Sequence, residues 1–400
     1  MLATLPETQE RAAHELRLQV SLGFAQMATD GFDAPSAEHT LKRALGLCQR
    51  VDDTQSFLMV LRGLPSIYFH QGKMREAQAL AEHHLRMSQR VGDQLHCQKA
   101  HLRLGQIALD LGELTVARTH GEQALTLSPP QHDWSSIEMG IDVGVDMRVS
   151  LAQCLWLLGY PDQARARIEE ALALARARAH PWSLAYALQK GAQIHAYCGA
   201  WPVVKVHADA LLMLATAQGL AWFGVCALHY LGQALAAQGY TAEGIAQMHR
   251  AMAAGQGVEG TLQQYFCACL AEAYGRSGQV DEGLALLADA LAQIHTRGRR
   301  ITESRLYRAQ GELLLALPAE QHQADAERCF HHALAAAHQQ RAKSLELRAA
   351  MSLARLWQLQ GKGAAAHQVL AEVYGWFTES FDTVDLQEAQ TLLCQLSVAP

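Results

Sequence analysis

The sequence of 400 residues is poor in proline, in aromatic residues and in charge, and each scarcity narrows the range of possible folds. Only 10 residues are proline, 6% are aromatic and 18% are charged, whereas 50% are hydrophobic. Little proline, together with abundant alanine, leucine and glutamine, favours helices and argues against a β-sandwich or a disordered chain. We therefore expect an ordinary hydrophobic core that is built from helices.

The chain also lacks an excess of positive charge, since its formal net charge is −6 and its isoelectric point is near 6.4. A dedicated nucleic-acid binder needs a basic field to meet phosphates, so we expect no nucleic-acid partner. One local basic run lies beside Tyr307, on which a base could stack, although a solvated turn between two helices explains the run equally well. The run consists of Arg297, Arg299, Arg300, Arg305 and Arg308.

The nine cysteines do not form a disulfide framework, because seven are scattered singly and only Cys267 and Cys269 are near neighbours. Residues two apart on a helix point to different faces, so this pair is not expected to share a metal ion. The N-terminus has no basic segment followed by an apolar stretch and is not expected to be a signal peptide. These features predict a protein of the reducing cytoplasm.

A long uncharged run could be mistaken for a membrane span. No aspartate, glutamate, lysine or arginine occurs between Ala210 and Ala242, which is longer than the roughly 20 residues that a membrane helix needs. The run is rich in alanine, glycine and glutamine, and the repeat described below divides it into two helices with a turn at Gly219. We expect no membrane association.

Motifs that carry catalytic chemistry are missing. The sequence contains no G-x4-G-K-[ST], no H-E-x-x-H and no G-x-S-x-G. One G-x-G-x-x-G occurs at Gly255, Gly257 and Gly260, but a dinucleotide site needs a strand before this motif. A helix that ends near Ala253 is expected there instead, so the glycines are interpreted as a turn between repeats. We therefore predict no catalytic, cofactor-binding or metal-binding residues, no cofactor and no enzymatic activity.

What the sequence does have is an internal repeat. A large apolar residue recurs nine times with spacings of 40, 40, 47, 40, 40, 39, 43 and 40 residues. Such regularity is the signature of a repeat protein in which each unit buries its apolar face against its neighbours. The recurring residues are Leu45, Leu85, Leu125, Leu172, Leu212, Met252, Leu291, Leu334 and Tyr374.

Two further sets of residues keep the same register. Eight positions before each large apolar residue lies a small one, and a small residue also directly precedes most of them; these two positions are seven apart and therefore share a helix face. Glycines end the preceding helix, where a left-handed cap favours them. The first set is Ala37, Ala77, Ala117, Ala164, Val204, Gly244, Gly283, Ala326 and Ala366. The glycines are Gly72, Gly112, Gly159, Gly199, Gly239, Gly278 and Gly361.

This pattern is that of the tetratricopeptide repeat (TPR), here with a period near 40 residues instead of the usual 34. It predicts an all-α fold, a right-handed α-solenoid of about nine TPR-like helix pairs. A generic bundle would not restart its register with a glycine at the same phase. We expect one solenoid over residues 1–400, an insertion at 128–148, and a last helix pair with a C-terminal cap at about 344–397.

Solenoids bind partners on the concave face that the first helices line. The position directly after the small residue of each first helix is a glutamine in four successive repeats and a glutamate in the next two. This pattern predicts an exposed row of hydrogen-bond donors and acceptors that suits a protein or peptide partner. Solvated positions chosen only for helix propensity would look the same. The row consists of Gln106, Gln153, Gln193, Gln233, Glu272, Glu312 and Arg355.

The C-terminal third has a distinctive sequence: AKSLELRAA at 342–350, SLARLW at 352–357, QGK at 360–362 and VYGWFTE at 373–379, followed by FDT at 381–383 and DL at 385–386. It resembles the C-terminal TPR region of bacterial signalling proteins in which an adenylate cyclase or DNA-binding domain precedes an AAA-type ATPase. LPETQER at 5–11 and GYPDQA at 159–164 fit the same region, so the resemblance covers essentially the whole chain. One departure is GIDVGV at 140–145, where the family tends to have GQDPGV.

The resemblance implies a non-enzymatic regulatory or sensor scaffold of such a signalling protein. The alternative is that the chain is a truncated fragment of a cyclase or ATPase whose catalytic domains lie upstream. The partner's identity, the oligomeric state and the role of the insertion are left open by the sequence.

Overall fold

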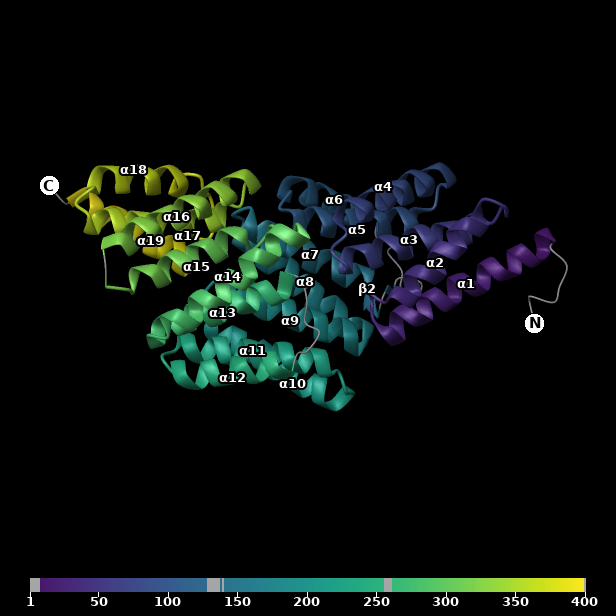
Figure 1. Cartoon of the computed structure of the whole chain (residues 1–400), viewed down its shortest axis with the longest axis horizontal. Helices are drawn as coiled ribbons and strands as arrows, with labels where there is room; N and C mark the ends of the chain where they lie inside the picture. Colours follow the sequence, from purple (N-terminus) through teal and green to yellow (C-terminus); the bar gives the residue numbers. More distant parts are fainter. Residues whose placement is uncertain (1–7, 128–136, 139, 255–260, 319, 399–400) are drawn as a thin grey trace.

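The computed structural model describes residues 8–127, 137–138, 140–254, 261–318 and 320–398, and this part of the chain is almost entirely helical (Figure 1). The odd-numbered helices are α1 (Gln9–Asp30), α3 (Thr54–His70), α5 (Gln94–Leu111), α7 (Val143–Leu157), α9 (Pro181–Tyr197), α11 (Ala221–Ala237), α13 (Thr261–Ser277), α15 (Glu303–Leu315), α17 (Lys343–Leu359) and α19 (Val384–Val398). The even-numbered helices are α2 (Pro35–Cys48), α4 (Met74–Val91), α6 (Leu114–Thr126), α8 (Pro161–Arg178), α10 (Trp201–Gln218), α12 (Thr241–Ala254), α14 (Val280–Arg297), α16 (Glu320–Gln340) and α18 (Gly363–Tyr374).

The helices begin and end where local chemistry dictates. Asp53, Asp93 and Asp142 cap the starts of α3, α5 and α7, because each carboxylate accepts a hydrogen bond from the backbone N–H three residues later. All seven glycines predicted to end the first helices of the repeats have a positive φ, between 72° and 96°. A side chain would strain the backbone there, so glycine stops each helix and turns the chain into the next one.

The small residues of the repeat lie where the two helices of a pair meet. All nine predicted positions from Ala37 to Ala366 are buried. The residues directly before the large apolar ones are buried as well, including His84 and Leu211, which are not small. The large apolar residues are mostly half-buried, so they mark the register while the small ones set the distance between helix axes.

The helix pairs stack into two layers. Each odd-numbered helix packs against its own even-numbered partner and also against the next odd-numbered helix, as α7, α9 and α11 do. The odd-numbered helices therefore form a continuous inner layer and the even-numbered helices lie outside it. This arrangement confirms the predicted α-solenoid of helix pairs, and α19 packs on α17 and α18 after the last pair.

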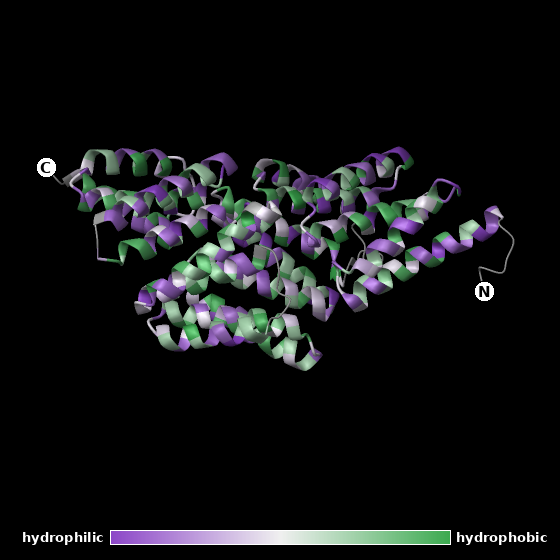
Figure 2. Cartoon of the chain, in the orientation of Figure 1, coloured by the Kyte–Doolittle hydropathy of each residue, from purple (hydrophilic) through white to green (hydrophobic). Residues whose placement is uncertain are grey.

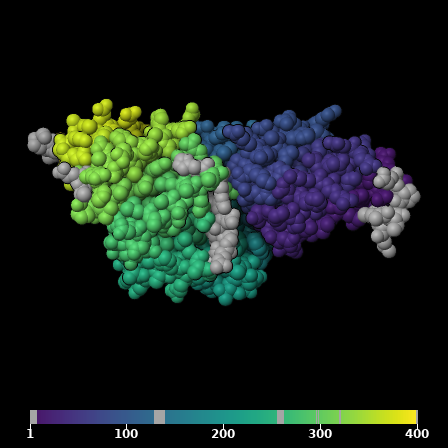
Figure 3. Space-filling view, viewed as in Figure 1, coloured from purple at the N-terminus to yellow at the C-terminus, as the bar shows by residue number. Residues whose placement is uncertain are grey.

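The solenoid winds so tightly that its N-terminal and C-terminal halves contact each other in the middle of the molecule, while α1 and α18 lie at its opposite ends (Figure 1). The hydroxyl of Ser344 donates to the carbonyl of Trp156, 188 residues away, and α17 contacts α7 directly. Arg299, between α14 and α15, is buried against Asp110 of α5 at 3.3 Å and donates to the carbonyl of Phe69. Figure 3 shows the blue N-terminal part in direct contact with the green part of the C-terminal half.

The predicted insertion at 128–148 contains the one departure from helix in the described part of the chain. Residues 128–136 and 139 lie outside the described residues. The two-residue strands β1 (Ile137–Glu138) and β2 (Ile141–Asp142) pair antiparallel across Gly140, and α7 follows at once. The backbone N–H of Asp142 donates to the hydroxyl of Ser183 at 2.8 Å, which ties this hairpin to the start of α9.

The uncharged run forms two helices, as predicted. Gly219, with φ of 68°, separates α10 from α11, and both helices are largely green and pale in Figure 2. Within the described residues, no helix combines the length and hydrophobicity that a membrane crossing requires. The G-x-G-x-x-G at 255–260 lies outside the described residues; α12 ends directly before it, at Ala254.

Candidate functional site

The predicted polar row lies on the inner layer, one residue per odd-numbered helix from α5 to α17. Its middle, however, is not exposed as expected. Gln153, Gln193 and Gln233 are only 8%, 3% and 5% exposed, whereas Glu312 and Arg355 near the C-terminal end are exposed. The reason is the tight winding, which covers the middle of the inner layer with neighbouring turns. The row is therefore a buried polar network that opens to solvent at one end.

At its N-terminal end the network runs from repeat to repeat. The amide nitrogen of Gln106 donates to both carboxylate oxygens of Asp146, at 3.1 and 3.0 Å. The hydroxyl of Tyr186, one further repeat along, donates to the same carboxylate at 3.2 Å. These partners are 40 residues apart, so they occupy equivalent positions on successive inner helices. The stacking of the repeats is what brings them together.

Lys190 joins the two central glutamines. Its ammonium lies 3.3 Å from the side-chain oxygens of both Gln153 and Gln193, and Gln193 donates in turn to the hydroxyl of Tyr197. Burial lowers the pKa of Lys190, although nearby Asp110 and Asp146 act in the opposite direction. A lysine in these surroundings is a poorly hydrated cation whose hydrogen bonds are long and go to neutral oxygens.

Toward the C-terminus the network becomes ionic. The carboxylate of Glu272 accepts hydrogen bonds from Arg305 at 2.9 Å and from Arg308 at 2.6 Å. Burial alone would raise the pKa of Glu272, but the two guanidinium groups hold it at about 2. Arg305 also lies over the ring of Tyr265, whose hydroxyl donates to Gln233 at 3.1 Å. Glu272 is therefore ionised and fully paired within the chain.

The last two members of the row lie near the surface. Glu312 accepts a hydrogen bond from the hydroxyl of Ser352, which is again 40 residues away. Arg355 forms an ion pair with Glu388 of α19 at 2.6 Å, and both side chains are about half exposed. Exposed pairs of this kind contribute little to stability, so these groups can exchange partners readily.

A small cavity lies at the centre of the network, with a volume of about 80 Å³. It is bounded by residues from both halves of the chain: Asp110, Gln153, Trp156, Leu157, Lys190, Gln193, Tyr197, Leu262, Tyr265, Ile301, Thr302, Arg305 and Leu345. Hydrogen-bond donors and acceptors and two cations, Lys190 and Arg305, therefore surround a space that is partly walled by aromatic rings. Such a space can hold a small polar group, which the surrounding side chains can bind through hydrogen bonds.

Sequence reasoning missed Lys190 and Arg305, although a signal existed for both. Lys190 precedes Gln193 by three residues, and Arg305 precedes Glu312 by seven. Both spacings place the cation on the same helix face as the row. A comparison of the other positions on the same helix face, repeat by repeat, would have shown that two cations accompany the row. How deeply these two side chains are buried could not be predicted in this way, because their burial depends on the winding of the solenoid.

The arginine run has a different role from either interpretation drawn from the sequence. Arg299 is buried against Asp110, Arg300 pairs with Glu303, and both Arg305 and Arg308 pair with Glu272. These four side chains point toward carboxylates within the chain. Arg299, Arg305 and Arg308 are 8%, 8% and 18% exposed and so do not form a solvated turn or a basic surface, whereas Arg300 is 42% exposed; the side chain of Arg297 lies outside the described residues.

Comparison with solved structures finds similar helical-repeat proteins over nearly the whole chain. A Rap protein complexed with competence and sporulation factor has 14% sequence identity and a TM-score of 0.54, over 90% of this chain and 100% of that chain. The fold is that of TPR-type solenoids. A Rap conjugation gene regulator of the plasmid pLS20, in complex with the Phr* peptide, has 10% identity and a TM-score of 0.56, over 97% of both chains. No protein-family model matches, and no match is found among curated proteins.

Proposed function

We propose that this TPR-type solenoid is a non-enzymatic scaffold that binds a protein or peptide along its inner layer. Gln153 and Gln193 of the polar row support this proposal, since together with Lys190 and Arg305 they place donors, acceptors and two cations around one cavity. The two similar solved structures are complexes, one with competence and sporulation factor and one with the Phr* peptide. At this level of identity the likeness concerns the fold, so the binding surface is argued from this chain's own residues.

The observation that carries the proposal is the bonding of Lys190. Its two hydrogen bonds, at 3.3 Å, are long and go to neutral amide oxygens. A carboxylate of a partner would give an ion pair with a shorter hydrogen bond, of about 2.7–2.9 Å. We therefore expect the partner to present an acidic side chain or a C-terminal carboxylate to Lys190.

The cavity of about 80 Å³ is smaller than a peptide segment. A partner therefore reaches Lys190 only when the contacts between the turns, such as that of Arg299 with Asp110, separate. Glu312 and Arg355, at the exposed end of the row, would meet the partner first. Binding would then exchange contacts within the chain for contacts with the partner.

The wider setting is proposed from the sequence resemblance. The TPR region would serve as one cytoplasmic interaction unit, which regulates a bacterial signalling ATPase or cyclase. The alternative is that the chain is a truncated part of such an enzyme, with catalytic domains upstream. An in-frame P-loop in the genomic sequence upstream of Met1 would favour that alternative.

A peptide-display selection on the purified protein tests the binding site. Peptides selected on the parent protein should carry carboxylates and should bind Lys190→Met about tenfold more weakly, because a charge-assisted bond is lost. Methionine keeps the length of the side chain, and thermal denaturation would check that the variant folds. The control is Met213→Ala, on the outer helix α10, where Met213 is 74% exposed.

Binding should be unchanged in Met213→Ala. If the selection yields no binders, or if all selected peptides bind Lys190→Met as tightly as the parent, the inner layer is not the binding site.

A further inference from the structure

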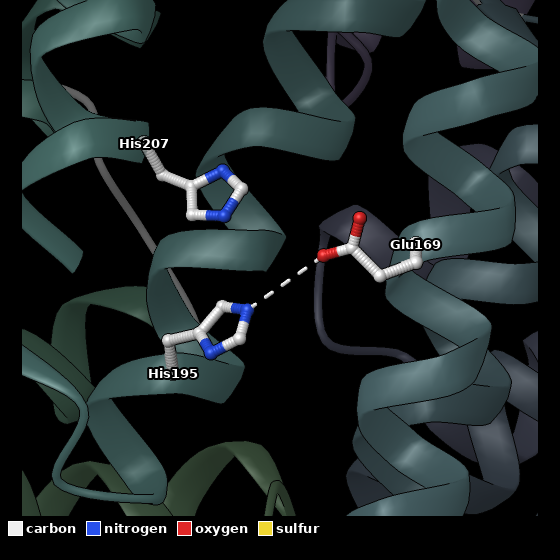
Figure 4. Close-up of side chains that lie close together, drawn as sticks. All are labelled: Glu169, His195 and His207. Atoms are coloured by element: carbon white, nitrogen blue, oxygen red, sulfur yellow. Dashed lines mark ion pairs between the residues drawn. The ribbon is translucent and has the colours of Figure 1, made fainter. Parts of the chain in front are cut away.

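Two histidines and a glutamate from three successive helices meet away from the polar row. They are Glu169 of α8, His195 of α9 and His207 of α10, and Figure 4 shows the two rings side by side, facing the carboxylate. One potential ligand atom from each lies within 4.8 Å of the other two. Nothing in the proposed binding function uses these residues.

The histidine rings are buried, and each has a nitrogen without a hydrogen-bond partner among the described residues. His195 and His207 are 8% and 7% exposed, and their rings stack at 5.2 Å with an angle of 13°. Neither Nε2 of His195 nor Nδ1 of His207 makes a hydrogen bond with any described residue. Buried polar atoms of this kind are rare without a function, because leaving them unpaired costs free energy.

A glycine makes room for this arrangement. Gly191 lies one helical turn before His195, and a Cβ atom there would lie 3.3 Å from Cε1 and Nδ1 of His207. The His207 ring therefore fits closely into a notch on α9, which fixes it beside His195. Glu169 differs, since its side chain is 63% exposed and free to turn toward the rings.

We infer that Glu169, His195 and His207 form a binding site for a divalent transition-metal ion such as Zn²⁺. Two imidazoles and one carboxylate are a ligand set that Zn²⁺ takes in proteins, and a water molecule completes the tetrahedron. Metal–ligand bonds of about 2.0–2.1 Å place tetrahedral ligand atoms about 3.4 Å apart. Nε2 of His195 and a carboxylate oxygen of Glu169 are 4.0 Å apart, so a small rotation of the exposed Glu169 side chain brings these two atoms to that distance.

The protonation state of the histidines suits a metal ligand. Burial lowers the pKa of His195 to about 4, helped by His207 and Arg165, and burial also lowers the pKa of His207. Both rings are therefore neutral at pH 7, so a metal ion has no proton to displace from them. An ion bound here would link α8, α9 and α10 and stabilise the middle of the solenoid.

Titration of the metal-free protein with ZnCl₂, followed by calorimetry, tests the site. The sequence has 20 histidines, so adventitious surface binding must be distinguished by variants. Loss of a residue that only hydrogen-bonds a metal ligand lowers the affinity for the metal by about 10–100-fold. Glu169 is itself a proposed ligand, so Glu169→Gln should lower the affinity for one Zn²⁺ ion per chain by at least that factor. Glu169 is exposed, which makes this variant safe for folding. His195→Gln should abolish the same equivalent.

The matched control is His101→Gln. His101 belongs to another histidine pair, in which its Nδ1 lies 2.9 Å from that of His120, with no carboxylate among the ligand set. His101→Gln should still bind, with the affinity of the parent protein, the one Zn²⁺ ion per chain whose binding Glu169→Gln weakens. With CoCl₂ as the probe, tetrahedral binding would give visible absorption in the parent protein and not in His195→Gln. Equal Zn²⁺ binding by the parent and Glu169→Gln, or no binding by the parent, would overturn the inference.

Discussion

At the scale of single residues, the close backbone contact between α11 and α12 depends on two glycines. A Cβ atom on Gly244 of α12 would lie 2.5 Å from the carbonyl oxygen of Gly232 on α11, and 2.7 Å from the backbone nitrogen of Ala236. Backbone atoms cannot move aside as a flexible side chain can. The two helices must therefore separate if either position gains a side chain.

The first prediction compares two Gly→Ala substitutions. Gly244→Ala should lower the free energy of unfolding by about 1–3 kcal/mol, since it overpacks this contact. Gly46→Ala, in α2, should raise it by up to about 1 kcal/mol, because its Cβ would have no atom within 4 Å and alanine is the better helix former. Urea denaturation measures both. Equal midpoints for the two variants would show that α11 and α12 do not pack as described.

Buried histidines make the stability of the fold depend on pH. His84 and His229 are 1% and 0% exposed, and burial lowers the pKa of each from 6.5 to about 3. Folding keeps them neutral, whereas the unfolded chain protonates them below about pH 6.5. Their contribution is therefore fully present above pH 6.5 and is lost as the pH falls from there toward 3.

The second prediction is a fall in stability on acidification, by about 1.4 kcal/mol per pH unit for each such histidine below its unfolded pKa. His229→Phe should reduce the slope of stability against pH by the contribution of one histidine. The new ring can keep the stacking on Phe266, whose ring centroid lies 3.6 Å from that of His229 in the parent protein. Melting temperatures between pH 7.5 and pH 5 measure the slope. An unchanged slope in His229→Phe would contradict the assignment.

At the scale of elements, one helix is capped from a distant part of the chain. The carboxylate of Glu379, in the loop between α18 and α19, accepts hydrogen bonds from the backbone N–H groups of Asp162 and Gln163 at 3.0 and 3.3 Å. These groups belong to the first turn of α8, where the helix dipole favours negative charge. The contact stabilises α8 and also holds the C-terminal part of the chain against it.

The third prediction is that Glu379→Gln lowers the free energy of unfolding by about 0.3–1 kcal/mol, the range for a negative charge at the N-terminus of a helix. Glutamine keeps an oxygen acceptor but removes the charge. Glu372→Gln is the matched control, because Glu372 lies exposed on α18. Denaturation of the two variants measures the difference. If both unfold at the same midpoint as the parent, the cap contributes nothing to α8.

At the scale of the whole molecule, the winding of the solenoid is stabilised by contacts between its N-terminal and C-terminal halves. The guanidinium of Arg299 is buried, pairs with Asp110, and stacks over the ring of Phe69 at 5.1 Å. Removing one partner of a buried ion pair is strongly destabilising, because the remaining buried charge loses a close counter-charge. This contact therefore couples the closed winding to the stability of the N-terminal repeats.

The fourth prediction is that Arg299→Ala opens the solenoid. The free energy of unfolding should fall by about 3–5 kcal/mol, and the radius of gyration in small-angle X-ray scattering should increase. Arg86→Ala is the control, since Arg86 forms only an exposed pair with Glu82. Scattering curves that coincide for the parent and Arg299→Ala would show that other contacts alone keep the two halves together.

The sequence by itself determined the repeat. The buried small residues, the glycines with positive φ and the division of the uncharged run at Gly219 were all predictable, because each depends on packing between elements within about 40 residues of each other. The same local logic placed the polar row on the inner layer, one residue per repeat.

Only the tertiary structure decided how deeply that row is buried. The contact of Ser344 with Trp156 joins residues 188 apart, and it depends on small rotations that accumulate over many repeats. No local sequence pattern encodes the total rotation that results. The same winding buries Gln193, places Arg299 against Asp110 and encloses Lys190. In the same way, the meeting of His195 with His207 depends on the notch at Gly191, which only the packing of α9 against α10 shows.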